Sequence, residues 1–71
     1  MDEANTGKAK RKREWVCECV NMKGAWQQYG GHFASLGGVR KMWSFHRVHG
    51  FPGPAPAARA RNVATGEIVA L

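Results

Sequence analysis

Residues 15–20 read Trp-Val-Cys-Glu-Cys-Val, which is the clearest strand signal in this chain of 71 residues. Side chains alternate between the two faces of a strand, so the odd-numbered and even-numbered residues of this stretch lie on opposite sides. The mixture of aromatic, thiol and β-branched side chains is typical of a mostly buried strand rather than of a helix. We therefore predict a strand here, with Trp15, Cys17 and Cys19 on one face.

The segment that follows indicates a hairpin. Asn and Gly tolerate the left-handed backbone of tight turns, so residues 21–24 (Asn-Met-Lys-Gly) predict a turn into a second strand over residues 25–29. Two pairs of glycines, at 30–31 and 37–38, then enclose residues 32–36. Paired glycines mark sharp turns or close backbone contacts, so we expect residues 32–36 to form a loop or a single helical turn.

Residues 39–49 fit two patterns. Val39, Trp43 and His46 recur at the spacing of a helix face, whereas alternate residues from Val39 to Arg47 also fit a strand. The Gly-Gly pair ahead and the Gly-Phe-Pro-Gly-Pro segment behind are typical of hairpins and loops rather than of helix caps. We therefore predict a strand.

The last third of the chain predicts a connector and a second hairpin. Residues 50–57 contain all three prolines, which favours an extended connector. Residues 58–63 and 67–71 flank a turn in which Gly66 can adopt a positive φ. Four or five short strands predict a mainly β domain over residues 14–71, either a small twisted antiparallel sheet or an incomplete barrel of the Src-homology-3 or oligonucleotide-binding size class.

Positive charge dominates the start of the chain. Residues 8–13 read Lys-Ala-Lys-Arg-Lys-Arg and place five positive charges on six positions. These charges repel one another and have no large apolar neighbours to bury, so we predict that residues 1–13 form a disordered basic arm. Residues 14–71 are basic too, with six basic residues against three acidic ones, and the whole chain has a formal net charge of +6. This balance favours a polyanionic partner.

Aromatic and basic residues are interleaved in the middle of the chain. Exposed aromatic faces stack on unpaired bases, and neighbouring Arg and Lys side chains neutralise phosphates. We therefore predict a non-enzymatic protein that binds nucleic acid, RNA in preference to DNA, or a ribonucleoprotein. The predicted contact residues are Lys8, Lys10, Arg11, Lys12, Arg13, Tyr29, Arg40, Lys41, Trp43 and Arg47. A small core also needs aromatic residues, so at least two of the three tryptophans are expected to be buried in it.

Metal binding and catalysis are weaker interpretations. The side chains that a zinc site would use are Cys17, Cys19, His32, His46 and His49. A Cys-x-Cys pair in a strand lacks the turn that brings thiolates together in structural zinc sites, so we expect buried, reduced cysteines and no metal. The chain has no nucleophile elbow, phosphate loop, dinucleotide fingerprint or paired carboxylates, and we expect neither catalysis nor a cofactor.

A protein-interaction module is the alternative function, such as an inhibitor or adaptor from a phage or mobile element that docks on a larger machine that handles nucleic acid. A short chain rich in aromatic residues and glycine cannot hide all its apolar surface, and the last hairpin offers an edge for strand addition. No stretch approaches the roughly 18 apolar residues of a membrane span. We expect no membrane contact and an intracellular location, cytoplasmic or nuclear.

Overall fold

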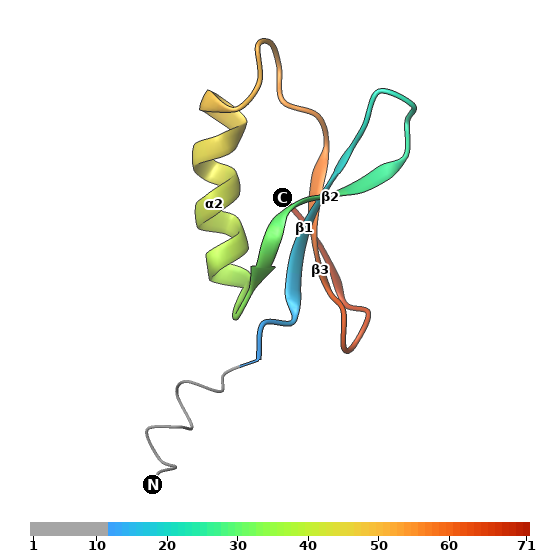
Figure 1. The fold of residues 1–71 in the computed structure, drawn as a ribbon, viewed down its shortest axis with the longest axis vertical. Helices are drawn as coiled ribbons and strands as arrows, with labels where there is room; N and C mark the ends of the chain where they lie inside the picture. The colour runs from blue at the N-terminus through green and yellow to red at the C-terminus, as the bar shows by residue number, and fades with distance from the viewer. Residues whose placement is uncertain (1–11) are drawn as a thin grey trace, which may run out of the picture.

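The computed structural model describes residues 12–71 as an antiparallel sheet with one helix (Figure 1). The elements, in chain order, are β1 (Trp15–Val20), β2 (Trp26–Phe33), α2 (Leu36–His49), β3 (Ala58–Asn62) and β4 (Ile68–Ala70). The four strands lie in the order β2-β1-β3-β4, and each neighbouring pair is antiparallel. This confirms the mainly β prediction in its open-sheet form. Of the predicted arm, residues 1–11 lie outside the described residues.

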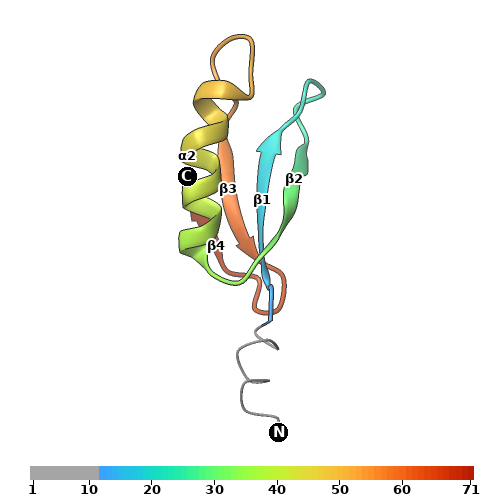
Figure 2. The same cartoon turned by 60° about the vertical axis from the view of Figure 1, so that its left-hand side comes forward.

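The core lies between α2 and one face of the sheet (Figure 2). Cys17 and Cys19 share one face of β1, as the alternation predicts; that face packs against the helix, where the two cysteines contact Val39, Trp43 and Ala60. The thiols are thus small core groups, which is common for free cysteines. Trp15 packs against this cluster and is half-buried. Of the three tryptophans, Trp43 is therefore buried in the core, Trp15 packs against it from the side and Trp26 is exposed, so the prediction of at least two buried tryptophans holds only in part.

The prediction of a strand over residues 39–49 is wrong, because this segment belongs to helix α2. Ser35 is the N-cap: its backbone is extended, and its hydroxyl accepts a hydrogen bond of 3.3 Å from the amide of Gly38. Such a cap satisfies one of the free amides of the first turn. The glycine pair at 37–38 thus lies inside the helix and does not form a turn. Val39 and Trp43 are the buried residues of its apolar face.

The first hairpin is confirmed, and its second strand is longer than predicted. In the turn, Gly24 has a φ of 81°, and the side chain of Asn21 accepts hydrogen bonds from the amides of Lys23 and Ala25. β2 continues to Phe33, so the loop predicted over residues 32–36 is reduced to a short connection. The glycines at 30–31 form an irregularity in the β1–β2 pairing, between the Val16 and Cys17 positions of β1, rather than a sharp turn.

The connector and the last hairpin are confirmed. Residues 51–57 contain no helix or strand. Between β3 and β4, Gly66 has a φ of 84°, and the side chain of Asn62 accepts hydrogen bonds from the amides of Ala64 and Thr65. Within residues 12–71, no helix has the length and apolar character needed to cross a bilayer.

Candidate nucleic-acid interface

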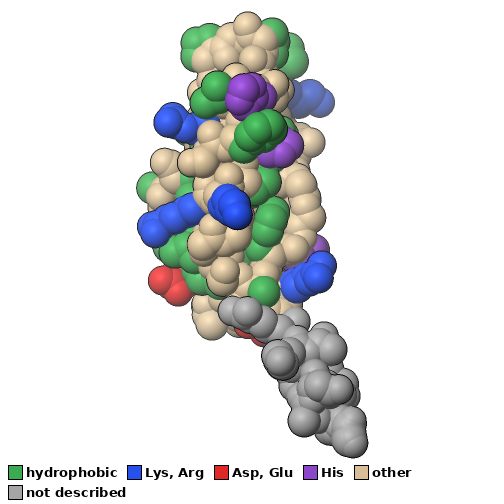
Figure 3. Space-filling model, turned by 90° about the vertical axis from the view of Figure 1, so that its left-hand side faces the viewer, with side chains coloured by type: hydrophobic (Ala, Val, Ile, Leu, Met, Phe, Trp, Pro, Cys, Tyr) green, Lys and Arg blue, Asp and Glu red, His purple; other side chains and the backbone are tan. Residues whose placement is uncertain are grey.

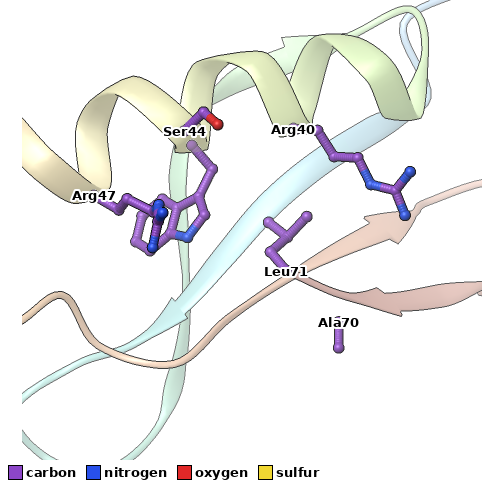
Figure 4. A pocket seen from close by; sticks show the side chains of 6 residues that line it. Arg40, Ser44, Arg47, Ala70 and Leu71 are labelled. Atoms are coloured by element: carbon purple, nitrogen blue, oxygen red, sulfur yellow. The ribbon is translucent and has the colours of Figure 1, made fainter.

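A cleft of about 290 Å³ lies between α2 and the end of β4 (Figure 4). The helix contributes Arg40, Ser44 and Arg47 to its lining, and Leu71 lies across from them. Residues four and seven positions apart recur on one side of a helix, so the fold of residues 36–49 aligns these three polar side chains. The cleft therefore combines two guanidinium groups and a hydroxyl with an apolar opposite wall.

Charge in this region is positive. Arg40, Lys41 and Arg47 are exposed, and within residues 12–71 none of them forms an ion pair. No acidic residue lines the cleft. Figure 3 shows the helix side of the molecule, where Lys and Arg side chains are spread over the surface and acidic side chains lie only near its lower end. The cationic groups of this side are thus available to an anionic ligand.

Lys41 differs from its neighbours on the helix. It follows Arg40 directly, and successive residues are separated by about 100° around a helix axis. Lys41 is exposed but does not line the cleft. It adds charge to the same helix without sharing the concave surface of Arg40 and Arg47.

Trp43 and Tyr29 meet in the interface between helix and sheet. Trp43 is only 6% exposed, with one edge at the cleft, and its ring meets that of Tyr29 edge-on at 5.7 Å. Phe51 stacks on Tyr29, with their ring centres 5.7 Å apart. The structure thus brings the two predicted aromatic contacts together: Trp43 is buried, whereas Tyr29 is half-buried.

The predicted basic arm meets the described part of the chain at Lys12 and Arg13. Both residues are exposed and lie just before Glu14 and β1, at the end of the molecule where α2 begins (Figure 1). Arg40 lies in the first half of that helix. The remaining predicted contacts, Lys8, Lys10 and Arg11, lie outside the described residues.

A second basic cluster lies on the opposite face of the sheet and was not among the predicted contacts. Arg59 and Arg61 of β3 donate hydrogen bonds of 2.8 and 2.9 Å from their Nε atoms to the two carboxylate oxygens of Glu18. The guanidinium of Arg59 also lies 4.1 Å from the ring centre of Trp26. Burial favours a higher pKa for Glu18, but the two arginines outweigh burial and lower that pKa.

The thiols and the histidines lie apart. Burial, and to a lesser extent the nearby Cys19 and Glu18, raises the pKa of the Cys17 thiol to about 11. Burial also raises the pKa of Cys19. His46 lies 2.9 Å from the hydroxyl of Tyr29, while His32 pairs with Val16 on the other face of the sheet. Among residues 12–71 no three His, Cys, Asp or Glu side chains form a group that could hold a metal ion.

A second cleft, of about 450 Å³, lies beside the first hairpin. Met22, Tyr29, Phe51 and Pro56 give it a largely apolar lining. Met22 is fully exposed in the hairpin turn. This cleft suits an apolar group rather than a phosphate.

Together, the fold and the basic cleft define a small, mainly β domain with one helix and a cationic helix side. No protein-family model, curated protein or solved structure matches this chain. Its function is therefore inferred from its own residues.

Proposed function

We propose that this protein binds nucleic acid, RNA in preference to DNA, and that it does so without catalysis. The observation that carries the proposal is the cleft between α2 and β4, in which Arg40, Ser44 and Arg47 meet and no Asp or Glu side chain belongs to the lining. A guanidinium group binds phosphate oxygens through two parallel hydrogen bonds, and a serine hydroxyl donates a third. The apolar side chain of Leu71 offers a contact for a ribose.

The shape of the cleft favours a single strand over a duplex. A space of about 290 Å³ can accept one phosphate and its sugar, whereas a duplex would need a wider basic surface. RNA that is recognised by side chains is mostly single-stranded or irregular. The proposal extends to RNA within a ribonucleoprotein, and it is consistent with an intracellular location.

The basic arm lengthens the proposed contact. Lys12 and Arg13 are exposed at the end of the molecule where α2 begins, and the basic run continues from them toward Lys8. A cationic segment adds phosphate contacts that depend on charge rather than on sequence. In this proposal the cleft positions one phosphate, while the arm and Lys41 increase affinity.

A salt series on the full chain tests the proposal. Fluorescence anisotropy with a labelled single-stranded RNA should give an affinity that falls with salt, with a log-log slope near −0.7 for each phosphate neutralised. Arg40→Ala and Arg47→Ala should each weaken binding and reduce the slope by about 0.7. A labelled DNA of the same sequence tests the preference for RNA.

Lys41→Ala is the matched control, because it removes the same charge from the same helix outside the cleft. It should weaken binding less than Arg40→Ala does. An affinity that does not depend on salt refutes nucleic-acid binding. Equal effects of Arg40→Ala and Lys41→Ala refute the role of the cleft.

The second candidate function is a module that binds a protein partner. It is favoured by the apolar cleft beside the first hairpin and by the full exposure of Met22 in the turn. Exposed apolar patches of this kind are typical of protein contacts. If RNA binding fails, Met22→Ser is the decisive variant. It should abolish binding of the protein partner, whereas Arg40→Ala should leave that binding unchanged.

A further inference from the structure

The face of the sheet opposite α2 carries a cluster built from three strands. Glu18 lies on the central strand β1, Arg59 and Arg61 lie on β3, and Trp26 lies on β2. The strand pairing sets Glu18 beside Arg59 and sets Trp26 beside Val20, so these side chains share one face. Within residues 12–71, the only helix lies on the other face (Figure 2).

The geometry of the cluster orients two guanidinium groups. Each arginine uses its Nε atom for a carboxylate oxygen of Glu18, at 2.8 Å for Arg59 and at 2.9 Å for Arg61. Among the described residues, the two terminal amino groups of each guanidinium form no side-chain hydrogen bond. The side chain of Glu18 is 11% exposed, whereas those of Arg59 and Arg61 are 24% and 36% exposed. The acid is thus covered, and the cations remain accessible.

A purely structural role accounts for the ion pairs of Glu18 but not for the exposure of the two arginines and of Trp26 beside them. Here a single carboxylate holds two arginines, so the cluster keeps an excess of positive charge. Trp26 is 42% exposed beside it, and the guanidinium of Arg59 lies over one face of its ring, 4.1 Å from the ring centre, so a stacked base would use the other face. An exposed indole next to fixed guanidinium groups is a combination that binds unpaired bases and their phosphates.

The spacing of the arginines fits an extended strand of nucleic acid. Residues two apart on a β-strand are separated by about 6.6 Å. This is on the order of the distance between successive phosphates of a single strand. Arg59 and Arg61 can therefore contact two adjacent phosphates while Trp26 stacks on a base.

We infer that this face of the sheet is a second binding surface for single-stranded nucleic acid, with Arg59 and Arg61 on the phosphates and Trp26 on a base. The inference rests on the proposed function for its ligand, but it uses residues on the opposite side of the molecule from the cleft. Glu18 is a positioning residue that holds the guanidinium groups and does not touch the ligand.

The first test is an NMR titration of the wild-type full chain with a short single-stranded RNA. The indole N–H of Trp26 and the Nε–H groups of Arg59 and Arg61 should shift in proportion to the bound fraction. The indole of the buried Trp43 reports on the helix side instead. If the RNA binds while the resonances of Trp26, Arg59 and Arg61 stay unchanged, the inference is overturned.

The second test uses variants and the same salt series. Trp26→Ala should weaken binding roughly tenfold, within the range measured for loss of one stacked base, and Trp26→Phe should recover most of it. Arg61→Gln should weaken binding and lower the slope by about 0.7, while Arg59 remains to pair with Glu18. Lys23→Gln is the matched control, since Lys23 is an exposed cation in the hairpin turn. Thermal melts verify that each variant is folded.

The outcomes separate this inference from the proposed function. If the wild type does not bind RNA, both fail. If Arg40→Ala and Arg47→Ala weaken binding but Trp26→Ala is silent and Arg61→Gln matches Lys23→Gln, then only the sheet surface is refuted. Competition with poly-glutamate tests for an acidic protein instead, because this polymer has charge without bases. If Trp26→Ala weakens poly-glutamate binding as much as RNA binding, the surface does not read nucleic acid and the inference is wrong.

Discussion

The hydroxyl of Tyr29 lies 2.9 Å from Nδ1 of His46, and this contact joins β2 to α2. The ring of Tyr29 also meets Trp43 edge-on and stacks on Phe51. Gly50, which ends the helix, approaches so closely that an added Cβ would lie 2.9 Å from the Tyr29 hydroxyl. Tyr29 thus connects the sheet, the helix and the connector. This position favours a role in stability over one in base stacking.

Tyr29→Phe should therefore destabilise the domain while preserving its fold. The variant keeps the aromatic packing but removes the hydroxyl that pairs with His46, and a typical hydrogen bond contributes about 0.5–1.5 kcal/mol. Urea denaturation should show a lower midpoint with an unchanged slope. Phe45→Leu is a suitable control, because Phe45 is 60% exposed and should change stability little. Equal midpoints for wild type and Tyr29→Phe would show that this hydrogen bond adds no stability.

The turn between β3 and β4 should tolerate only glycine at position 66. Gly66 has a φ of 84°, so Gly66→Val forces a β-branched side chain into a strained conformation that costs on the order of 1–3 kcal/mol. Gly53→Ala should be nearly silent, because an added Cβ there meets nothing within 4 Å. Thermal melts of the two variants provide the comparison. A fall in melting temperature for Gly53→Ala as large as that for Gly66→Val contradicts the role of the turn.

The strands follow from local patterns, whereas the helix does not. Alternation in β1 and a glycine turn before β4 are local signals, and both predict what the structure shows. Residues 39–49 carry helical and strand periods together, and the glycine pair at 37–38 favours a turn. Tertiary packing decides the conflict, because the Cys17 face of the sheet must be covered and Val39 and Trp43 cover it from one helix face. The N-cap Ser35 was the available local sign.

In the candidate site, too, some features follow from the sequence and others only from the fold. Charge alone identifies Arg40 and Arg47, and the helix then brings them to one cleft. Glu18 pairs with Arg59 and Arg61, which follow it in the chain by 41 and 43 positions. No local sequence pattern predicts pairs at such a separation. The sequence of β3, in which Arg alternates with Ala, was the available signal. Opposite charges on neighbouring strands stabilise a sheet, so an acidic residue on the adjacent strand, such as Glu18, is a favourable partner for these arginines.

The buried thiols predict slow chemical modification. Cys17 is fully buried and Cys19 is 9% exposed, and burial raises the pKa of both thiols. Thiolates are the reactive species, so at neutral pH both residues should react with alkylating reagents far more slowly than free cysteine does. In denaturing urea, both should react at the rate of free cysteine. Mass spectrometry after a timed iodoacetamide pulse measures this difference. Rapid labelling of the native protein would contradict the burial of the β1 face.

The Glu18 cluster predicts how stability changes with pH. The pKa of Glu18 is held below its ordinary value of 4.5, so the folded state binds its proton less readily than the unfolded chain does. Its contribution is therefore complete above the ordinary pKa and is lost as the pH falls through the lowered value. At neutral pH, Glu18→Gln should cost about 1.5–3 kcal/mol, the scale of a hydrogen bond to a charged group. The difference in unfolding free energy between wild type and variant should shrink as the pH falls below 4.5.

Glu67→Gln, which neutralises an exposed carboxylate in the last turn, is the control and should change stability little. A difference between wild type and Glu18→Gln that stays constant from neutral to acid pH would show that the charge of Glu18 does not stabilise the cluster.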